Sequence, residues 1–207
     1  MAQPDVGEGA RLAAATGAWT CFEEESGQAL QPPKARTWGR RGHTPVVRVS
    51  GRGSGRISVA ALACVKAGEP GRFFYRMQDH RLRPGTRRAM SEADYAGLIT
   101  AAHRYLNAPV IVIWDNLNTH LSRKMTAFTT GHPDWLTVVQ LPAYAPDLNP
   151  VEGAWSMMKN SLGNLAAGTT DQLAAAMRHQ LDRIQRRPDL ITGFLGQTGL
   201  TLDPQPP

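Results

Sequence analysis

Apolar runs shorter than a typical helix dominate the first third of this chain. Four of them stand out: "AWTCF" (18–22), "TPVVRVS" (44–50), "RISVAALACV" (56–65) and "GRFFYRM" (71–77). Such runs, bounded by glycine, proline and other turn residues, predict strands. Ser26-Gly27 predicts a turn after the first run, and the glycines between the second and third runs predict a hairpin. We therefore expect an antiparallel meander.

From residue 91 onward, helical spacing alternates with further strands. Ser91-Glu92-Ala93-Asp94 is a helix-start signal, and apolar residues then recur every three to four positions up to Leu106. "APVIVIW" (108–114) is a continuous apolar run, as in a strand with both faces buried. "LTVVQL" (136–141), which is mainly apolar, predicts another short strand. The remaining helices are expected over 120–130 with Thr119 as cap, over 150–162, over 170–186, and briefly after Pro188.

This order of elements predicts a single α/β domain over residues 17–200. Its mixed sheet is expected to hold three antiparallel strands and then alternating strands and helices, with helices on its faces. Residues 1–16 are expected to form a mobile N-terminal tail and 201–207 a C-terminal tail. A chain of 207 residues with 42% hydrophobic and 19% charged residues is typical of a globular protein with one core. We find no internal repeat.

Basic residues are concentrated in one segment. The net charge is +6 with a pI near 9.8, which makes a polyanion a reasonable partner. No acidic residue occurs between Glu25 and Glu69. Arginine suits phosphate through its planar set of donors, although an ordinary solvated surface would also explain the segment. The candidate DNA-binding residues are Lys34, Arg36, Arg40, Arg41 and Arg48.

Several protein classes are disfavoured. Cys21 and Cys64 each lie in an apolar run, which favours two buried thiols over a disulfide or a metal pair. The six histidines are scattered, without zinc-ligand spacing. No apolar stretch approaches the roughly 20 residues needed to span a bilayer. The N-terminus lacks the pattern of a secretion signal, so we expect a cytoplasmic protein with no membrane partner.

Acidic residues occur at the ends of three predicted strands. Asp115 follows 108–114 directly, Glu23, Glu24 and Glu25 end the first strand, and Glu152 comes soon after 136–141. The carboxyl ends of strands are where open α/β sheets place their sites. Converging carboxylates suit Mg²⁺, and two such ions roughly 3.5–4 Å apart clamp the attacking and leaving oxygens of a phosphodiester.

Each acid also has a structural explanation. Asp115, with the asparagines after it, could form a turn. Glu152 would complete a capping box if Asn149 is the N-cap and Pro150 the first helical residue. Glu23 to Glu25 could be a solvated strand end. A capping role for Glu152 is compatible with catalysis, because the helix entry can determine where the carboxylate lies.

The segments "WDNLNTH" and "LPAYAPDLNPVEGAW", preceded by "CFEEESGQALQPPKARTWGRRGHTP", resemble the DDE transposases of bacterial insertion sequences in the mariner superfamily. The similarity runs from about Trp19 to Leu195. It implies a ribonuclease H-like fold and two Mg²⁺ or Mn²⁺ ions when DNA is bound. It also implies strand cleavage by water and transfer by the freed 3′ hydroxyl. The expected partners are transposon ends, target DNA and a second copy of the chain in an active homodimer.

The resemblance assigns the catalytic and metal-binding roles. Asp115 matches the second acid and Glu152 the third, and Glu24 occupies the position of the first aspartate. The family normally has Asp-Glu-Ser-Gly where this chain has Glu24-Glu25-Ser26-Gly27. The extra methylene displaces the carboxylate, and misplacements of that order can cost about 100-fold in rate. Strand alternation puts Glu24 on one face and Glu23 and Glu25 on the other, so only one parity can face the site.

Three functions remain open at this point. The leading one is a metal-dependent DNA strand transferase. Full family members carry N-terminal helix-turn-helix modules, and this chain shows no such pattern. End recognition is therefore expected to be missing or supplied by a separate polypeptide. The alternatives are a catalytically impaired DNA-binding transposase remnant and a ribonuclease H-like nuclease acting on RNA or hybrids.

Overall fold

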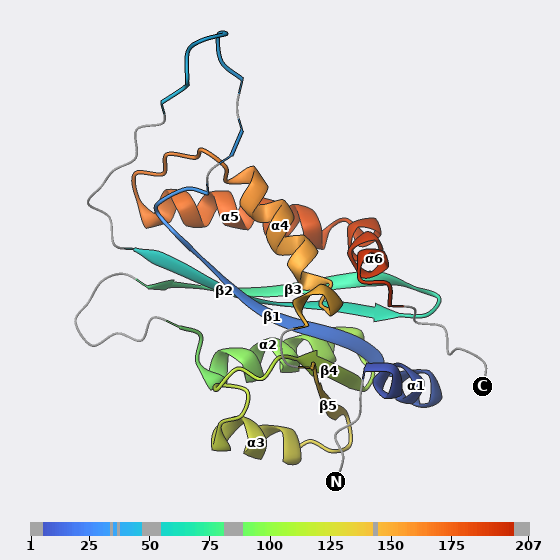
Figure 1. Cartoon of the computed structure of the whole chain (residues 1–207). Coiled ribbons are helices and arrows are strands. Elements are labelled where there is room, and N and C mark those ends of the chain that lie inside the picture. Colours follow the sequence, from blue (N-terminus) through green and yellow to red (C-terminus); the bar gives the residue numbers. More distant parts are fainter. Residues whose placement is uncertain are drawn as a thin grey trace.

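The computed structural model describes residues 6–33, 35–36, 38–46, 55–80, 89–142 and 145–200. In this part of the chain a five-stranded sheet forms the centre, in the order β3-β2-β1-β4-β5 (Figure 1). β2 pairs antiparallel with β1 and β3, whereas β4 pairs parallel with β1 and β5. This confirms the predicted mixed sheet. The strands are β1 (Trp19–Ala29), β2 (Arg56–Lys66), β3 (Glu69–His80), β4 (Val110–Trp114) and β5 (Leu136–Gln140).

Both faces of the sheet are buried at β2 and β4, which explains why these two strands are largely apolar. Successive residues of a strand point to opposite faces, so β2 contributes to two separate cores. One core receives Ile57, Val59, Ala61 and Ala63, and the other receives Ala60, Leu62 and Cys64. All five residues of β4 are also buried. This confirms the prediction of a strand covered on both faces within 108–114, although the strand begins only at Val110.

Helices form a layer on each side of this sheet (Figure 1). On one face lie α4, α5 and α6, whose apolar side chains join the core that contains Ile57; α2 lies on the other face. None of the described helices is long and apolar enough to cross a membrane. The helices are α1 (Val6–Thr16), α2 (Glu92–Leu106), α3 (Arg123–Thr130), α4 (Val151–Ser161), α5 (Thr170–Gln185) and α6 (Pro188–Gln197), with a 3₁₀ turn η1 (Pro146–Leu148) before α4.

The prediction of a mobile tail over residues 1–16 is wrong from Val6 onward, because α1 begins there. Ala13 is buried, and a Cβ placed on Gly9 would lie 3.3 Å from Val139 of β5. The helix thus lies against the sheet through small residues four positions apart. Such a face gives no pattern of large apolar residues for sequence analysis to detect. The predicted C-terminal tail, 201–207, lies outside the described residues.

The predicted hairpin between 44–50 and 56–65 is also wrong. Both edges of β2 are occupied, by β1 and β3, so β2 has no free edge for a further strand. Residues 44–46 have no regular structure, and 47–50 lie outside the described residues. Likewise, Ser26-Gly27 is no turn, since β1 continues to Ala29. Gly27 instead makes room for the Arg56 side chain, whose Nη2 would lie 2.3 Å from a Cβ at that position.

Helix capping agrees with the sequence in one case and differs in another. Ser91 caps α2 with the predicted capping box: its hydroxyl accepts the Asp94 N–H, and the Asp94 carboxylate accepts the Ser91 N–H at 2.9 Å. α3 is capped by Ser122, not by Thr119, and begins at Arg123. Residues 118–121 form turns that bring the chain from the end of β4 to this helix.

The two cysteines are free and buried, as predicted. They lie directly opposite each other on β1 and β2. Burial raises the pKa of the Cys64 thiol, so it behaves as an apolar side chain in the core.

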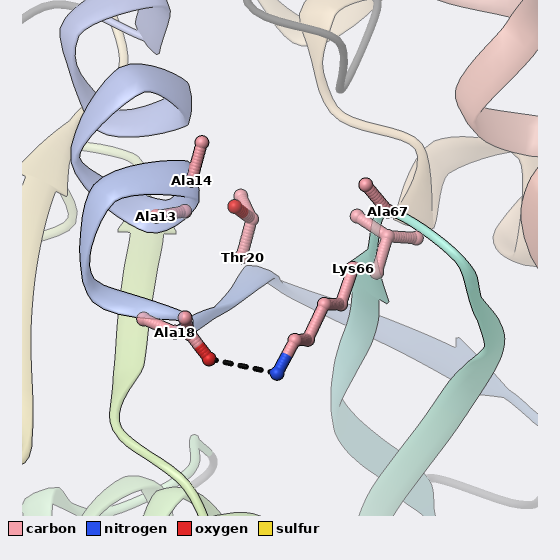
Figure 2. Close-up of a pocket in the computed structure, with 8 residues that line it drawn as sticks. Ala13, Ala14, Ala18, Thr20, Lys66 and Ala67 are labelled. Atoms are coloured by element: carbon pink, nitrogen blue, oxygen red, sulfur yellow. Dashed lines mark hydrogen bonds between the residues drawn. The ribbon is translucent and has the colours of Figure 1, made fainter.

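A small recess lies where α1 ends and β1 begins. It has a volume of about 210 Å³ and is lined mainly by small side chains. The Lys66 ammonium donates to the Gly17 carbonyl at 2.8 Å across its mouth (Figure 2). This contact ties the end of β2 to the turn between α1 and β1.

The packing of α5 on the sheet predicts a large loss of stability for Leu181→Ala. Leu181 is fully buried, so truncation leaves a cavity and should lower the free energy of unfolding by about 2–5 kcal/mol. Urea denaturation measures this change. Leu121→Ala is the matched control, because Leu121 is 51% exposed and should change stability by less than about 0.5 kcal/mol. Equal effects of the two substitutions would contradict the packing.

Candidate active site

Asp115 begins the loop that follows β4. Phe22 of β1 pairs in parallel with Ile113 of β4. Glu24 and Asp115 each lie two residues further along the chain, Glu24 within β1 and Asp115 just after β4. Asp115 Oδ1 accepts the Leu117 N–H at 3.0 Å, which is the Asx turn that the sequence offered as an alternative. The turn and a functional role coexist, because the Asp115 side chain remains 47% exposed.

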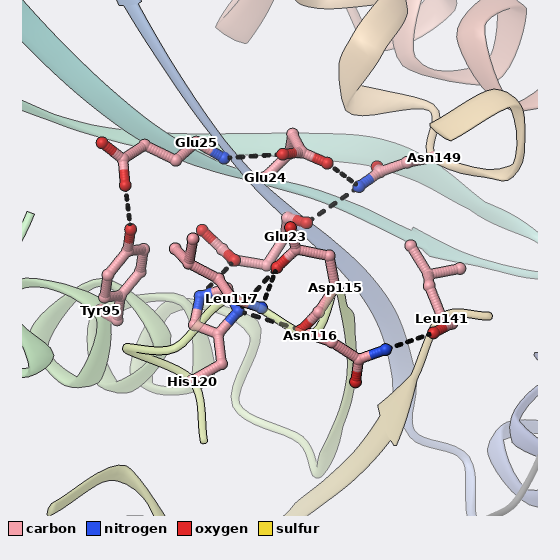
Figure 3. A network of polar contacts seen from close by, with 10 residues as sticks. All are labelled: Glu23, Glu24, Glu25, Tyr95, Asp115, Asn116, Leu117, His120, Leu141 and Asn149. Carbon is pink, nitrogen blue, oxygen red and sulfur yellow. Dashed lines mark hydrogen bonds and ion pairs between the residues drawn. The ribbon is translucent and has the colours of Figure 1, made fainter. Parts of the chain in front are cut away.

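The three consecutive glutamates of β1 lie in two different environments (Figure 3). Phe22, on the same face as Glu24, belongs to the core that α4 covers. Glu23 and Glu25 point to the opposite face. Glu25 accepts a hydrogen bond from Tyr95 of α2 at 2.5 Å. The parity question left by the sequence therefore has an answer: Glu24 is the glutamate on the α4 side.

Glu24 lies within the electrostatic reach of both other candidate acids. Burial first, and then the negative charges of Asp115, Glu23 and Glu152, raise the pKa of Glu24 to about 7. Charges raise one another's pKa only when they are near in space. Glu24, within β1, therefore lies within electrostatic range of both Asp115, in the loop after β4, and Glu152, in the first turn of α4.

Glu152 lies in the first turn of α4, but the predicted capping box does not form. The N-cap is Pro150, one residue later than expected, and Glu152 is the second helical residue instead of the third. The Glu152 side chain makes no capping hydrogen bond among the described residues. Asn149 Oδ1 instead accepts the Val151 N–H at 3.1 Å. Glu152 is exposed and faces a cavity of about 570 Å³ between α4 and α6.

The Asn149 amide connects the helix start to β1. It is 2% exposed, and its Nδ2 donates to the Glu23 carbonyl and to Glu24 Oε2, both at 2.9 Å (Figure 3). One side chain thus positions the glutamate of β1 relative to the helix that carries Glu152. The sequence predicts only a helix-capping role for Asn149. The motif "LNPVE" marks Asn149 in the sequence. It does not indicate the hydrogen-bond partners of Asn149, which lie far away along the chain.

His120 is a second residue whose role the sequence did not reveal. Its Nε2 lies 3.0 Å from Glu23 Oε2, and its Nδ1 lies 3.1 Å from Asp115 Oδ1. Burial would lower the pKa of His120, but the hydrogen bond with Asp115 and the ion pair with Glu23 outweigh burial and raise the pKa to about 10. The hydrogen bond with His120 in turn lowers the pKa of Asp115. In the sequence, His120 stands out only as the last residue of the motif "WDNLNTH".

The candidate DNA-binding arginines do not lie beside the acids. Arg36, Arg40 and Arg41 are exposed in the segment between β1 and β2, whereas Lys34 and Arg48 lie outside the described residues. Asn164 Nδ2 donates to the Ala35 carbonyl at 3.0 Å, so this segment is attached beyond the C-terminal end of α4. Glu152 lies at the other end of that helix, roughly 16 Å away at 1.5 Å per residue.

These carboxylates are chemically suited to hard cations, which prefer oxygen ligands. Among the described residues, no three His, Cys, Asp or Glu side chains are close enough to hold one ion. Mg²⁺ is commonly bound by only one or two carboxylates, with water and substrate phosphate as its other ligands. The acids therefore offer one or two carboxylate ligands to such an ion and leave its other coordination positions open.

Comparison with protein families identifies the chain. Residues 20–174, most of its length and all three acids, match the family described as DDE superfamily endonuclease. The chain belongs to this family. The resemblance to DDE enzymes seen in the sequence is thereby confirmed. No similar protein was found among curated sequences.

Solved structures of the Mos1 mariner transposase have a similar fold. The DDE domain covers 89% of its length in the Mos1 paired-end complex with Mg, with a TM-score of 0.57 and 15% identity. It covers 94% in a pre-cleavage Mos1 transpososome, with a TM-score of 0.55 and 14% identity. It spans 56% and 60% of those chains. At this level of identity the similarity establishes the fold, which is ribonuclease H-like as expected.

The raised pKa of Glu24 predicts how stability depends on pH. In metal-free DDE protein, the unfolded chain loses this proton near pH 4.5 and the folded chain near pH 7. Stability therefore falls as pH rises through this window. Glu24→Gln removes the effect. The variant should match the wild type at pH 4 and exceed its unfolding free energy by about 2–3 kcal/mol at pH 8, measured by urea denaturation in EDTA. A constant difference at both pH values would contradict the assignment.

Proposed function

We propose that this chain is the catalytic domain of a DNA transposase. It hydrolyses a phosphodiester bond at the end of a transposon and joins the freed 3′ hydroxyl to target DNA. The observation that supports this most directly is the electrostatic interaction of Glu24 with both Asp115 and Glu152, in a chain that belongs to the DDE endonucleases. The solved Mos1 complexes contain a transposon end, and forms with Mn and with Mg are known.

In this proposal the three carboxylates share two Mg²⁺ or Mn²⁺ ions. Such ions, when bound, neutralise the acids and polarise the phosphate between the attacking and leaving oxygens. The protein's own contribution is placement. Asn149 holds Glu24, the Leu117 N–H and His120 hold Asp115, and the first turn of α4 presents Glu152. The positive end of the α4 dipole stabilises a carboxylate there.

The basic segment is proposed to hold the DNA. Arg36, Arg40 and Arg41 would contact phosphates, with Lys34 and Arg48 added from the same stretch of sequence. Its attachment one helix length from Glu152 suits a duplex that runs along α4 from the cleavage site to the arginines. Recognition of transposon ends by a separate helix-turn-helix polypeptide, a homodimeric active form and a cytoplasmic location stay predictions.

Asp115→Asn tests the catalytic assignment. The substitution preserves size but removes a negative ligand, so nicking of supercoiled DNA in Mg²⁺ or Mn²⁺ should fall at least roughly 100-fold. EDTA should abolish nicking by the wild type. Asp134→Asn, at an exposed turn before β5, is the matched control and should nick normally. Equal nicking by Asp115→Asn and the wild type would refute the catalytic role of Asp115.

Glu24→Asp tests whether the glutamate impairs the site. Shortening the side chain restores the family's usual ligand geometry, so we expect nicking to rise by up to about 100-fold. Initial rates on one plasmid, compared at saturating Mn²⁺, measure the change. If wild type and variant both remain inert yet bind DNA, the chain is a DNA-binding remnant and the enzymatic proposal fails.

Arg40→Ala tests the DNA-binding surface. Loss of one phosphate contact should weaken DNA binding for every sequence and reduce the slope of log K against log salt by about 1. Fluorescence anisotropy over a salt series measures both quantities. Arg104→Ala, an exposed arginine of α2, is the matched control. If Arg104→Ala reduced the slope and Arg40→Ala left it unchanged, the DNA would bind elsewhere on the protein.

A further inference from the structure

Glu23 has no part in the proposed metal site, because it points to the opposite face of β1 from Glu24. It is nevertheless 1% exposed, deep in the sheet, where it lies 3.0 Å from His120 Nε2. A buried ion pair adds little to stability compared with well-packed apolar residues of equal volume. The Glu23–His120 pair therefore needs an explanation other than stability.

The second nitrogen of His120 provides that explanation. Nδ1 lies 3.1 Å from Asp115 Oδ1 and 3.2 Å from the Asp115 carbonyl oxygen (Figure 3). One imidazole ring thus connects a buried carboxyl of β1 to the carboxyl that follows β4. His120 therefore links β1 to the loop after β4, beside the candidate acids Glu24 and Asp115.

The ring has little freedom to rotate. It is stacked on Trp114, with 4.5 Å between ring centroids and an angle of 7° between planes. Tyr95 packs against it in a T-shaped arrangement, with 4.9 Å between ring centroids, and Tyr95 donates a hydrogen bond to Glu25. Contacts at both nitrogens and with these two aromatic rings therefore restrict the imidazole.

The result is an Asp115 carboxyl with two unlike oxygens. Oδ1 contacts both the Leu117 N–H and His120. Oδ2 accepts no hydrogen bond from the described residues, and the side chain is 47% exposed. The contacts made by Oδ1 fix the carboxyl plane and leave Oδ2 available at the surface.

We infer that His120 is a positioning residue: anchored by Glu23 and stacked on Trp114, it orients Asp115 so that Oδ2 is presented to a divalent cation. This inference rests on the proposed function, in which Asp115 is a metal ligand. Residues that orient metal ligands in this way typically account for 10–100-fold of metal affinity. A histidine that served only the core would affect stability and leave metal affinity unchanged.

Direct binding of Mn²⁺ to the full chain tests the inference without reference to nicking. Electron paramagnetic resonance measures free Mn²⁺ in a titration. His120→Leu should weaken Mn²⁺ binding by about 10–100-fold, and His120→Asn, whose amide can replace Nδ1 as a donor to Asp115, should recover most of the loss. His103→Leu is the matched control: His103 is stacked on Trp135 at 4.0 Å outside the site, and its loss should leave Mn²⁺ affinity unchanged.

The outcomes separate this inference from the proposed function. Wild-type affinity in a folded His120→Leu variant, with binding lost in Asp115→Asn, would overturn the positioning role alone. If His120→Leu does not fold, Glu23→Gln decides: weaker Mn²⁺ binding supports the anchor, and unchanged binding overturns it. A wild-type chain that binds no Mn²⁺, with or without DNA, would overturn both.

Discussion

The site depends on the place of β1 in the sheet, where it pairs with β2 over Thr20–Ala29 and with β4 over Trp19–Phe22. Its apolar side chains alternate between two cores, one on each face of the sheet. Three consecutive glutamates are therefore divided between two environments. Glu24 meets the helix that carries Glu152, while Glu23 and Glu25 are held by His120 and Tyr95. A shift of one residue in the register would reverse this arrangement.

Electrostatics then divides the molecule into two functional regions. The site contains several carboxyls, and burial, followed by the negative charges of Asp115, Glu23 and Glu152, raises the pKa of Glu24. The rest of the chain is basic, with a net charge of +6. A nucleic acid would be attracted by the whole protein yet repelled by the site itself. Divalent cations between the carboxyls and the phosphate resolve this conflict, which is a physical reason for the proposed metal dependence.

Burial of polar groups explains why the surrounding residues are so specific. A buried amide or carboxyl needs partners, because an unpaired one costs about 1–3 kcal/mol or more. Asn149 satisfies three such requirements at once, for β1, for Glu24 and for the start of α4. The constraint that stabilises the loop therefore also positions the acids, so stability and catalytic geometry are coupled in these residues.

The wrong predictions have a common physical origin. α1 packs on the sheet through small residues, which leave no pattern of large apolar positions, and Gly27 lies within a strand and leaves room for Arg56. The expected capping box at Glu152 gave way to Asn149, whose side chain bonds to a strand far away in sequence. In each case a contact between distant segments outweighed a local preference.

Local patterns by themselves determined the buried strands, most helices, the mixed α/β architecture and the three candidate acids, because burial and helical or strand periodicity are written into neighbouring residues. Tertiary structure alone decided which glutamate of β1 faces the site, that Asn149 and His120 orient the acids, and that the arginines lie a helix length away. These outcomes depend on which strand lies beside which, and on where each side chain then points. Pairing between strands far apart in sequence leaves no periodic trace in either one.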